Sequence, residues 1–134
     1  MQIKAHQLTQ TSIAEITSDT TIIDSIEAGT DLLGSLYYQG YDKVIIHQKN
    51  ISPEFFDLKT KMAGEILQKF SNYQVRLTIV GDFEEVESKS LRDFIRESNR
   101  GKLVNFVDSL EEAVRRLSNY ALAPNEEGND LQGG

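Results

Sequence analysis

The sequence predicts a single α/β domain with a mixed, mostly parallel sheet of about five strands and four helices. Three observations predict it: short apolar runs typical of buried strands, longer stretches with helical spacing, and the regular alternation of the two. The expected order over residues 1–120 is β-β-α-β-α-β-α-β-α. Such alternation favours right-handed crossovers between parallel strands, with the first strand antiparallel to the second.

Two strands and one helix are expected at the start of the chain. The segments "IKAHQLTQ" and "SIAEIT" alternate loosely between apolar and polar residues, which predicts a hairpin that turns near Gln10 and Thr11. Apolar residues then recur at roughly helical spacing from Ile22 to Tyr37, and Gly40 follows as a stop. The side chains offered as N-caps for this helix are Ser18, Asp19 and Thr20.

A buried strand and a long helix are expected in the middle of the chain. The apolar run in "YDKVIIHQK" is typical of a strand that is covered on both faces. The segment "PEFFDLKTKMAGEILQKFSNY" predicts one continuous helix, which starts at Pro53 directly after Ser52. The apolar stripe of this helix consists of Phe55, Leu58, Met62, Ile66 and Phe70.

Gly64 interrupts this predicted helix at a cost of about 1 kcal/mol against alanine. Close packing of a neighbouring element at Gly64 is the expected compensation, and the approach of a partner is the alternative. The pairs Asp57–Lys61 and Glu65–Lys69 have the acid-to-base spacing that stabilises an exposed helix face.

The remaining chain adds two strands, two helices and a tail. The segments "VRLTIVGD" and "KLVNFV" are predicted strands, and "SKSLRDFIRESNRG" and "DSLEEAVRRLSNY" are predicted helices. Their candidate N-caps are Ser88 or Ser90 for the first and Asp108 or Ser109 for the second. Residues 121–134, "ALAPNEEGNDLQGG", have no apolar period and predict a disordered acidic tail.

Composition excludes several classes of function. The 134 residues carry a formal net charge of −7 without a basic run, which disfavours binding to nucleic acid or to an anionic membrane surface. The absence of cysteine excludes disulfides, thiolate nucleophiles and cysteine-based zinc sites. No segment has the pattern of a secretory signal or the length of a membrane span. We therefore expect an acidic cytoplasmic protein of bacterial type.

Recognisable catalytic or cofactor motifs are also missing. His6 and His47 lack an acid or a second histidine at helical ligand spacing, so they predict no metal site. Gly81 follows a strand, but no glycine-rich phosphate motif surrounds it. No strand-to-helix elbow presents a serine nucleophile, and the hydroxyls of Ser52 and Ser88 are explained as helix caps. The sequence thus predicts no catalytic residue, metal or cofactor.

The candidate site follows from topology. Ligands of open α/β sheets bind beyond the carboxyl ends of the parallel strands. This edge is expected to include His47, Gly81 and the helix start around Asp57. The candidate binding residues are Asp57, Lys59, Thr60, Glu65, Asp82, Arg92 and Asp93. Ordinary ion pairs on a solvated helix face are the alternative explanation of these charges.

Three segments resemble a known family: "FFDLKTKMAGEILQKFSNYQVRLTIVGDF", "SKSLRDFIRESNRG" and "FVDSLEEA". The family is an uncharacterised bacterial one, described only as a domain of unknown function. The resemblance extends from the first strands to about Leu117 and implies no activity.

The order of strands and helices is also similar to the anti-sigma-factor-antagonist (STAS) fold and its STAS-like relatives. In the antagonist family, a serine that follows an aspartate at one helix start is phosphorylated by a partner kinase. The corresponding residues here are Asp57 to Thr60, where Leu58 and Lys59 follow the aspartate and Thr60 carries the first hydroxyl. The chain therefore departs from the phosphorylation pattern of that family.

The function predicted from these observations is a non-enzymatic regulatory or protein-interaction module that binds a protein partner or a second copy. The alternative is a small-molecule-binding or enzyme domain with its pocket at the carboxyl ends of the parallel strands. A third hypothesis is a phosphorylation switch at Thr60 or Ser88.

Overall fold

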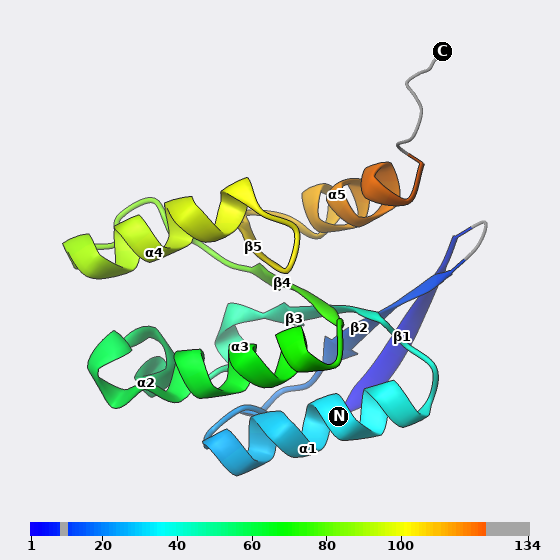
Figure 1. Cartoon of the computed structure of the whole chain (residues 1–134), viewed down its shortest axis with the longest axis horizontal. Helices are drawn as coiled ribbons and strands as arrows, with labels where there is room; N and C mark the ends of the chain where they lie inside the picture. Colours follow the sequence, from blue (N-terminus) through cyan, green and yellow to red (C-terminus); the bar gives the residue numbers. More distant parts are fainter. Residues whose placement is uncertain (9–10, 123–134) are drawn as a thin grey trace.

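The computed structural model describes residues 1–8 and 11–122 (Figure 1). The predicted turn at Gln10 and nearly all of the predicted tail, residues 123–134, lie outside the described residues. The last helix includes residues 121 and 122, which the sequence assigns to the tail.

A five-stranded sheet forms the centre of the molecule. Its strands lie in the order β1-β2-β3-β4-β5, with β1 antiparallel to β2 and the other neighbours parallel. The strands are β1 Gln2–Gln7, β2 Ser12–Thr17, β3 Lys43–His47, β4 Arg76–Val80 and β5 Val104–Val107. This arrangement confirms the predicted mixed sheet and its antiparallel first strand.

Helices cover both faces of the sheet (Figure 1). They are α1 Ile26–Tyr38, α2 Pro53–Phe56, α3 Met62–Asn72, α4 Lys89–Arg100 and α5 Leu110–Leu122. Helices α1 and α3 pack on the face that carries Ile46 and Ile79, and α5 packs on the face that carries Ile13 and Ile45. Within the described residues, no helix has the length and apolar character that a membrane crossing requires.

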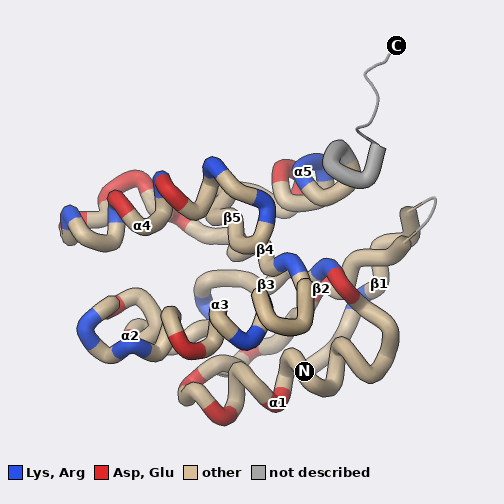
Figure 2. The backbone as a smooth tube through the Cα atoms, viewed as in Figure 1, with Lys and Arg blue, Asp and Glu red and all other residues tan. Residues whose placement is uncertain are grey.

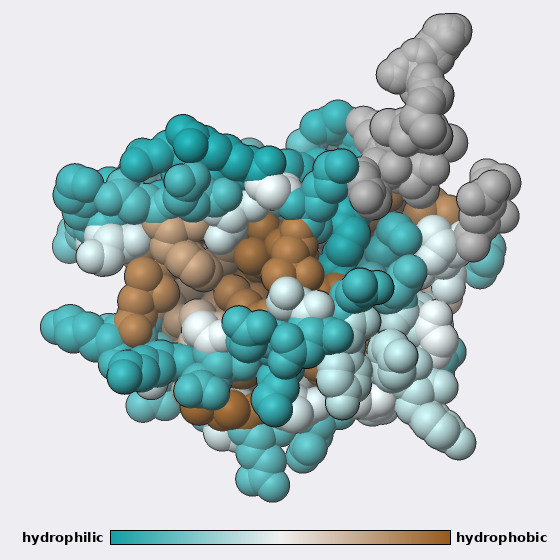
Figure 3. Space-filling model, viewed as in Figure 1, coloured by the Kyte–Doolittle hydropathy of each residue, from teal (hydrophilic) through white to brown (hydrophobic). Residues whose placement is uncertain are grey.

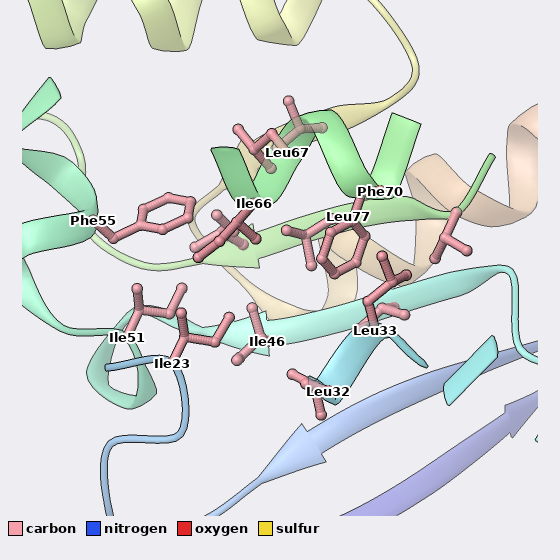
Figure 4. Packing of buried hydrophobic residues seen from close by; sticks show 14 of the residues in the cluster. Ile23, Leu32, Leu33, Ile46, Ile51, Phe55, Ile66, Leu67, Phe70 and Leu77 are labelled. Atoms are coloured by element: carbon pink, nitrogen blue, oxygen red, sulfur yellow. The ribbon is translucent and has the colours of Figure 1, made fainter. Parts of the chain in front are cut away.

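The larger part of the core lies between α1, α3 and the sheet. Ile66 and Phe70 extend from α3 toward Ile46 and Leu77 of the strands, and all four are buried (Figure 4). Gly29 brings α1 close to α3, because a Cβ at Gly29 would lie 2.7 Å from Ile66 Cδ1. The apolar stripe predicted for the central helix therefore does hold it against the sheet.

The first helix begins later than its predicted caps. Ser25 is the N-cap of α1, and its hydroxyl accepts from Ala28 N at 3.0 Å. The prediction of Ser18, Asp19 or Thr20 as the cap is therefore wrong. The buried amide of Asn50 explains the difference, since Nδ2 donates to the carbonyls of Ser18 and Thr20 at 2.8 Å each. These bonds hold the segment before α1 in an extended path.

The single helix predicted from Pro53 is also wrong, because the segment forms two helices. Helix α2 ends at Phe56, a 3₁₀ turn spans Leu58–Thr60, and Lys61 adopts a left-handed conformation with φ 66° before α3 begins. This break explains why the described chain has five α-helices rather than the predicted four.

Candidate functional site

The turn between α2 and α3 is built by its own polar side chains. The Asp57 carboxylate accepts from Lys59 N at 3.2 Å, while the Thr60 hydroxyl lies 2.8 Å from Glu54 O and accepts from Met62 N at 3.2 Å. Such local bonds compete with helical hydrogen bonds and end α2 here. Asp57 and Thr60 therefore have structural roles in the turn, although both are exposed.

The predicted acid-to-base pairs are not formed. Among the described residues, neither Asp57–Lys61 nor Glu65–Lys69 comes within 4.0 Å as an ion pair. The left-handed Lys61 interrupts the helical spacing on which the first pair depends. Lys59 and Lys61 are both exposed and have no acidic partner within the described chain.

Two further candidates lie at the other side of α3. Asp82 follows β4, and its backbone N–H donates to Gln48 Oε1 at 3.0 Å. The Arg92 guanidinium donates to the carbonyls of Val86 and Glu87 at 2.9 and 2.8 Å, which ties the loop before α4 to that helix. No described hydrogen bond or ion pair joins these residues to the Asp57–Thr60 turn.

Asp93 is engaged within α4. It forms ion pairs with Lys89 at 2.7 Å and with Arg96 at 2.6 Å. The pKa of Asp93 is lowered chiefly by the hydrogen bond from Lys89; the hydrogen bond from Arg96 and the charges of both bases add to this, while desolvation opposes it. The seven candidates thus do not converge into one polar site; four lie on the α2–α3 segment on one side, and the other three lie after β4 and on α4 on the other side.

An aromatic floor lies between these two sides. Phe83 stacks edge-on against Phe106, with ring centroids 5.3 Å apart, and Phe94 does the same at 6.0 Å. Phe56 lies 6.0 Å from Phe83 at the α2 end. In Figure 3, apolar side chains are visible between the polar outer surfaces of α4 and of α2 and α3. We call this surface the α3–α4 groove.

The α3–α4 groove contains two hollows. One, of about 490 Å³, is lined by Leu58, Lys61, Gly64, Glu65, Gln68 and Phe94. The other, of about 410 Å³, is lined by Thr21, Gln48, Lys49, Ile51, Pro53, Phe56, Phe83, Val86 and Leu91. Only Glu65 of the predicted site residues lines either hollow, so sequence reasoning missed the groove itself.

Gly64 lies in the wall of the first hollow. A Cβ at Gly64 would meet no atom within 4 Å, apart from its own helix and chain neighbours. The predicted close packing at Gly64 is therefore wrong, and the close contact occurs at Gly29 instead. Of the two explanations predicted for Gly64, the approach of a partner remains a prediction.

A second polar cluster spans three strands on the opposite face of the sheet. His6 Nε2 lies 2.8 Å from Glu15 Oε1, and His47 Nε2 lies 2.7 Å from Glu15 Oε2. Burial of Glu15 acts to raise its pKa, but the hydrogen bonds from His47 and His6, together with their charges, leave the pKa lowered. Glu15 is therefore held as a carboxylate by two imidazole rings.

Sequence reasoning missed this His6–Glu15–His47 cluster because its members come from β1, β2 and β3. The alternation of the predicted hairpin offers one signal, since His6 and Glu15 share a face if the turn lies near residue 10. Within residues 1–8 and 11–122, no group of three histidine or acidic side chains has an arrangement that could hold a metal ion.

The carboxyl ends of β4 and β5 border a hollow with a volume of about 760 Å³. Its lining includes Gly81, Asn99, Asp108 and Ser109, with acidic and basic side chains from the start of α5. The Ser109 hydroxyl accepts from Glu112 N at 3.0 Å and caps α5. The expected strand-end edge therefore has a hollow, but it lies away from Asp57.

Residues 8–117 match the model of the family described as "Domain of unknown function (DUF4180)". The chain belongs to this family. The match confirms the predicted resemblance and spans the DUF4180 chain from the end of β1 into α5. No curated protein matches the sequence.

A solved structure with a similar fold comes from Thermotoga maritima, and its protein has been proposed to be an anti-sigma factor antagonist. It is 13% identical, covers 84% of the DUF4180 chain and 92% of its own chain, and gives a TM-score of 0.45. The expected similarity to this fold is thus found, at a level too low to carry an argument about function.

Proposed function

We propose that this protein is a non-enzymatic protein-interaction module with a regulatory role. It receives an amphipathic helix of a partner protein in the α3–α4 groove. The observation that carries the proposal is Gly64, a helical glycine without any packing neighbour at the position of its missing Cβ. It lies beside Phe94 in a hollow whose floor is aromatic.

The shape of the groove supports a helix as the occupant. Binding of an amphipathic helix requires an apolar trough that receives side chains spaced by about one helical turn. Two hollows offer such positions, one of about 490 Å³ between α3 and Phe94 of α4, and one of about 410 Å³ between α2 and Leu91 of α4. The half-buried side chains of Phe56, Leu58 and Phe83 are available to contact the apolar face of the partner.

Charge at the groove supports an acidic flank on the partner helix. Lys61 lines one hollow and Lys49 lines the other, and Lys59 lies in the adjoining turn. None of the three has a carboxylate within 4.0 Å among the described residues, although the whole chain has a net charge of −7. Figure 2 shows blue segments at the α2 end of the groove. Carboxylates of the partner would complement these lysines.

The experiment is a selection from a displayed library of amphipathic helices with variable apolar and flanking residues. We expect the selected peptides to bind with apolar residues at i, i+3/i+4 spacing and acids on one flank. The blocking variant is Gly64→Gln, whose Cβ would meet no atom within 4 Å. It should weaken binding about tenfold or more, which corresponds to about 1.4 kcal/mol.

Gly34→Gln is the matched control, because Gly34 is also a helical glycine with nothing near its missing Cβ and lies on α1. It should leave peptide binding unchanged. A second pair compares Lys61→Glu, which should weaken binding, with Lys69→Glu, which should not. The proposal fails if no peptide is selected, or if Gly64→Gln and Gly34→Gln have the same effect.

The strand-end hollow of about 760 Å³ favours a second candidate, the binding of a small molecule at the carboxyl ends of β4 and β5. A thermal-shift screen of metabolites and nucleotides tests it. A ligand at a hundred times its dissociation constant should stabilise the protein by about 2.7 kcal/mol. Asp108→Arg should abolish that shift, since Asp108 lines the hollow. A flat screen would remove this candidate.

A further inference from the structure

The two edges of the sheet differ in whether another part of the chain hydrogen-bonds to the outer backbone of the edge strand. At the β5 edge, Asn99 of α4 pairs with the backbone of Phe106: Nδ2 donates to Phe106 O at 3.1 Å, and Oδ1 accepts from Phe106 N at 2.7 Å. This side-chain amide forms the two bonds that a neighbouring strand would form. At the β5 edge, the outward backbone groups of Phe106 are therefore already occupied by the chain itself.

The β1 edge has no such cover in the described chain. Leu8 N donates to Thr11 O at 2.7 Å, which identifies the pair Leu8–Thr11 as hydrogen-bonded. Because hydrogen-bonded pairs alternate along antiparallel strands, His6 and Lys4 also direct their backbone groups to β2. The backbone groups of Ile3, Ala5 and Gln7 must then point away from the sheet. No described hydrogen bond outside the strand pairing reaches these three residues.

We propose that β1 pairs with β1 of a second copy, antiparallel and two-fold symmetric about Ala5. In this register Ile3 lies opposite Gln7 of the second copy, and Ala5 lies opposite Ala5. All three outward-facing residues then form hydrogen-bonded pairs, each of which exchanges two backbone bonds. The outcome is one continuous sheet through two chains, and it does not depend on the α3–α4 groove.

Charge favours a second copy at this edge and selects the register. Residues 1–8 contain no acid, although each chain has a net charge of −7, so two copies meet here with the least repulsion. A register centred on Lys4 would also keep the hydrogen-bond phase, but it would place Lys4 opposite Lys4. Like charges directly opposite destabilise a strand pair. Centring on Ala5 places Lys4 opposite His6, which already contacts the Glu15 carboxylate.

Natural edge strands are commonly protected by proline, bulges, inward charges or a covering element. The β1 strand has an unbroken six-residue ladder with β2, contains no proline, and carries Lys4 as its only permanently charged side chain. Because Asn99 occupies the backbone of Phe106 at the opposite edge, β1 is the better edge for extension of this sheet.

Cysteine cross-linking of the full chain tests the pairing and its register, because the protein has no cysteine of its own. Residues in a hydrogen-bonded antiparallel pair have Cα atoms about 5.5 Å apart, which a disulfide can span. Ala5→Cys should therefore form a covalent dimer on mild oxidation. Lys4→Cys is the matched control and should form no covalent dimer, since diagonal neighbours lie about 7–8 Å apart. Cross-linking at Lys4→Cys but not at Ala5→Cys would overturn the proposed register.

Sedimentation equilibrium provides the second readout. The unmodified protein should dimerise, and Ala5→Pro should weaken the dimer about tenfold or more, because proline removes an outward N–H without breaking a bond to β2. Ala5→Val keeps the N–H and should dimerise as before. Circular dichroism should show that both variants fold. A monomer at every concentration, or equal dimerisation of Ala5→Pro and Ala5→Val, would overturn the proposal.

Discussion

The two flanks of helix α3 meet very different surroundings. On the flank toward α1, Ile66 is fully buried and lies so close to Gly29 that no Cβ fits there. On the flank toward α4, Gly64 faces open space, and the apolar side chains that line the hollow beside it are the partly exposed Leu58 and Phe94. One amphipathic helix thus holds the core on one side and borders a groove on the other.

This difference shows that a glycine in a helix has no single structural meaning. Gly29 is a buried glycine required by a helix–helix contact, whereas Gly64 is an exposed glycine that no contact within the described chain requires. The same sequence signal therefore indicates packing at one position and accessible surface at the other. Substitutions on the two flanks should separate these roles.

The largest loss in the free energy of unfolding is expected from Ile66→Ala. The side chain of Ile66 is 0% exposed, so its truncation leaves a cavity between α1, α3 and the sheet. We expect a loss of about 2–5 kcal/mol in the free energy of unfolding. Urea denaturation followed by circular dichroism measures it. Gln68→Ala, on the exposed surface of the same helix, should change stability by about 0.5 kcal/mol or less, and similar losses for the two variants would contradict the comparison.

The next largest loss of stability is expected from Gly29→Ala. Its new methyl group would lie 2.7 Å from Ile66 Cδ1, so α1 and α3 would have to move apart. Overpacking of this kind destabilises by about 1–3 kcal/mol. A double-mutant cycle with Ile66→Val, which removes the nearest atom, should recover part of the loss. Strict additivity of the two substitutions would show that the strain arises elsewhere.

The sequence predicts the elements that depend on local patterns. Strands β3 and β2 can be predicted from the apolar run Val44–Ile46 and from the alternation of Ser12–Thr17. This is possible because the burial pattern of a strand appears in residues that are adjacent in the sequence. The caps at Ser52 and Ser88 are found for the same reason. The mostly parallel pairing of the strands then follows from their alternation with helices.

Long-range contacts account for what the sequence does not predict. The start of α1 is shifted by Asn50, which lies 32 residues after Ser18 in the chain. The α3–α4 groove depends on side chains from helices that are adjacent only in the fold, such as Leu58 and Phe94. The cluster of Glu15 with two histidines likewise requires the pairing of three strands.

Thr60→Val tests the turn that leads into the open flank. The substitution removes a hydroxyl that lies 2.8 Å from Glu54 O and accepts from Met62 N. We expect a loss of about 1 kcal/mol, the usual net contribution of one hydrogen bond. Thermal unfolding measures the change, and Thr60→Ser should restore stability because it keeps the hydroxyl. Equal stability of the valine and serine variants would show that the turn does not depend on this hydroxyl.

The smallest change in stability is expected for Gly64→Ala, and it is the only one of these changes that should stabilise the protein. Alanine is favoured over glycine in a helix by about 0.5–1 kcal/mol, and the new methyl group meets nothing within 4 Å. The free energy of unfolding should therefore rise by up to that amount. Gly34→Ala in α1 is the matched control, since its methyl group also enters open space. If Gly64→Ala lost stability while Gly34→Ala gained it, the flank toward α4 would be closed in solution, and the two flanks of α3 would be alike.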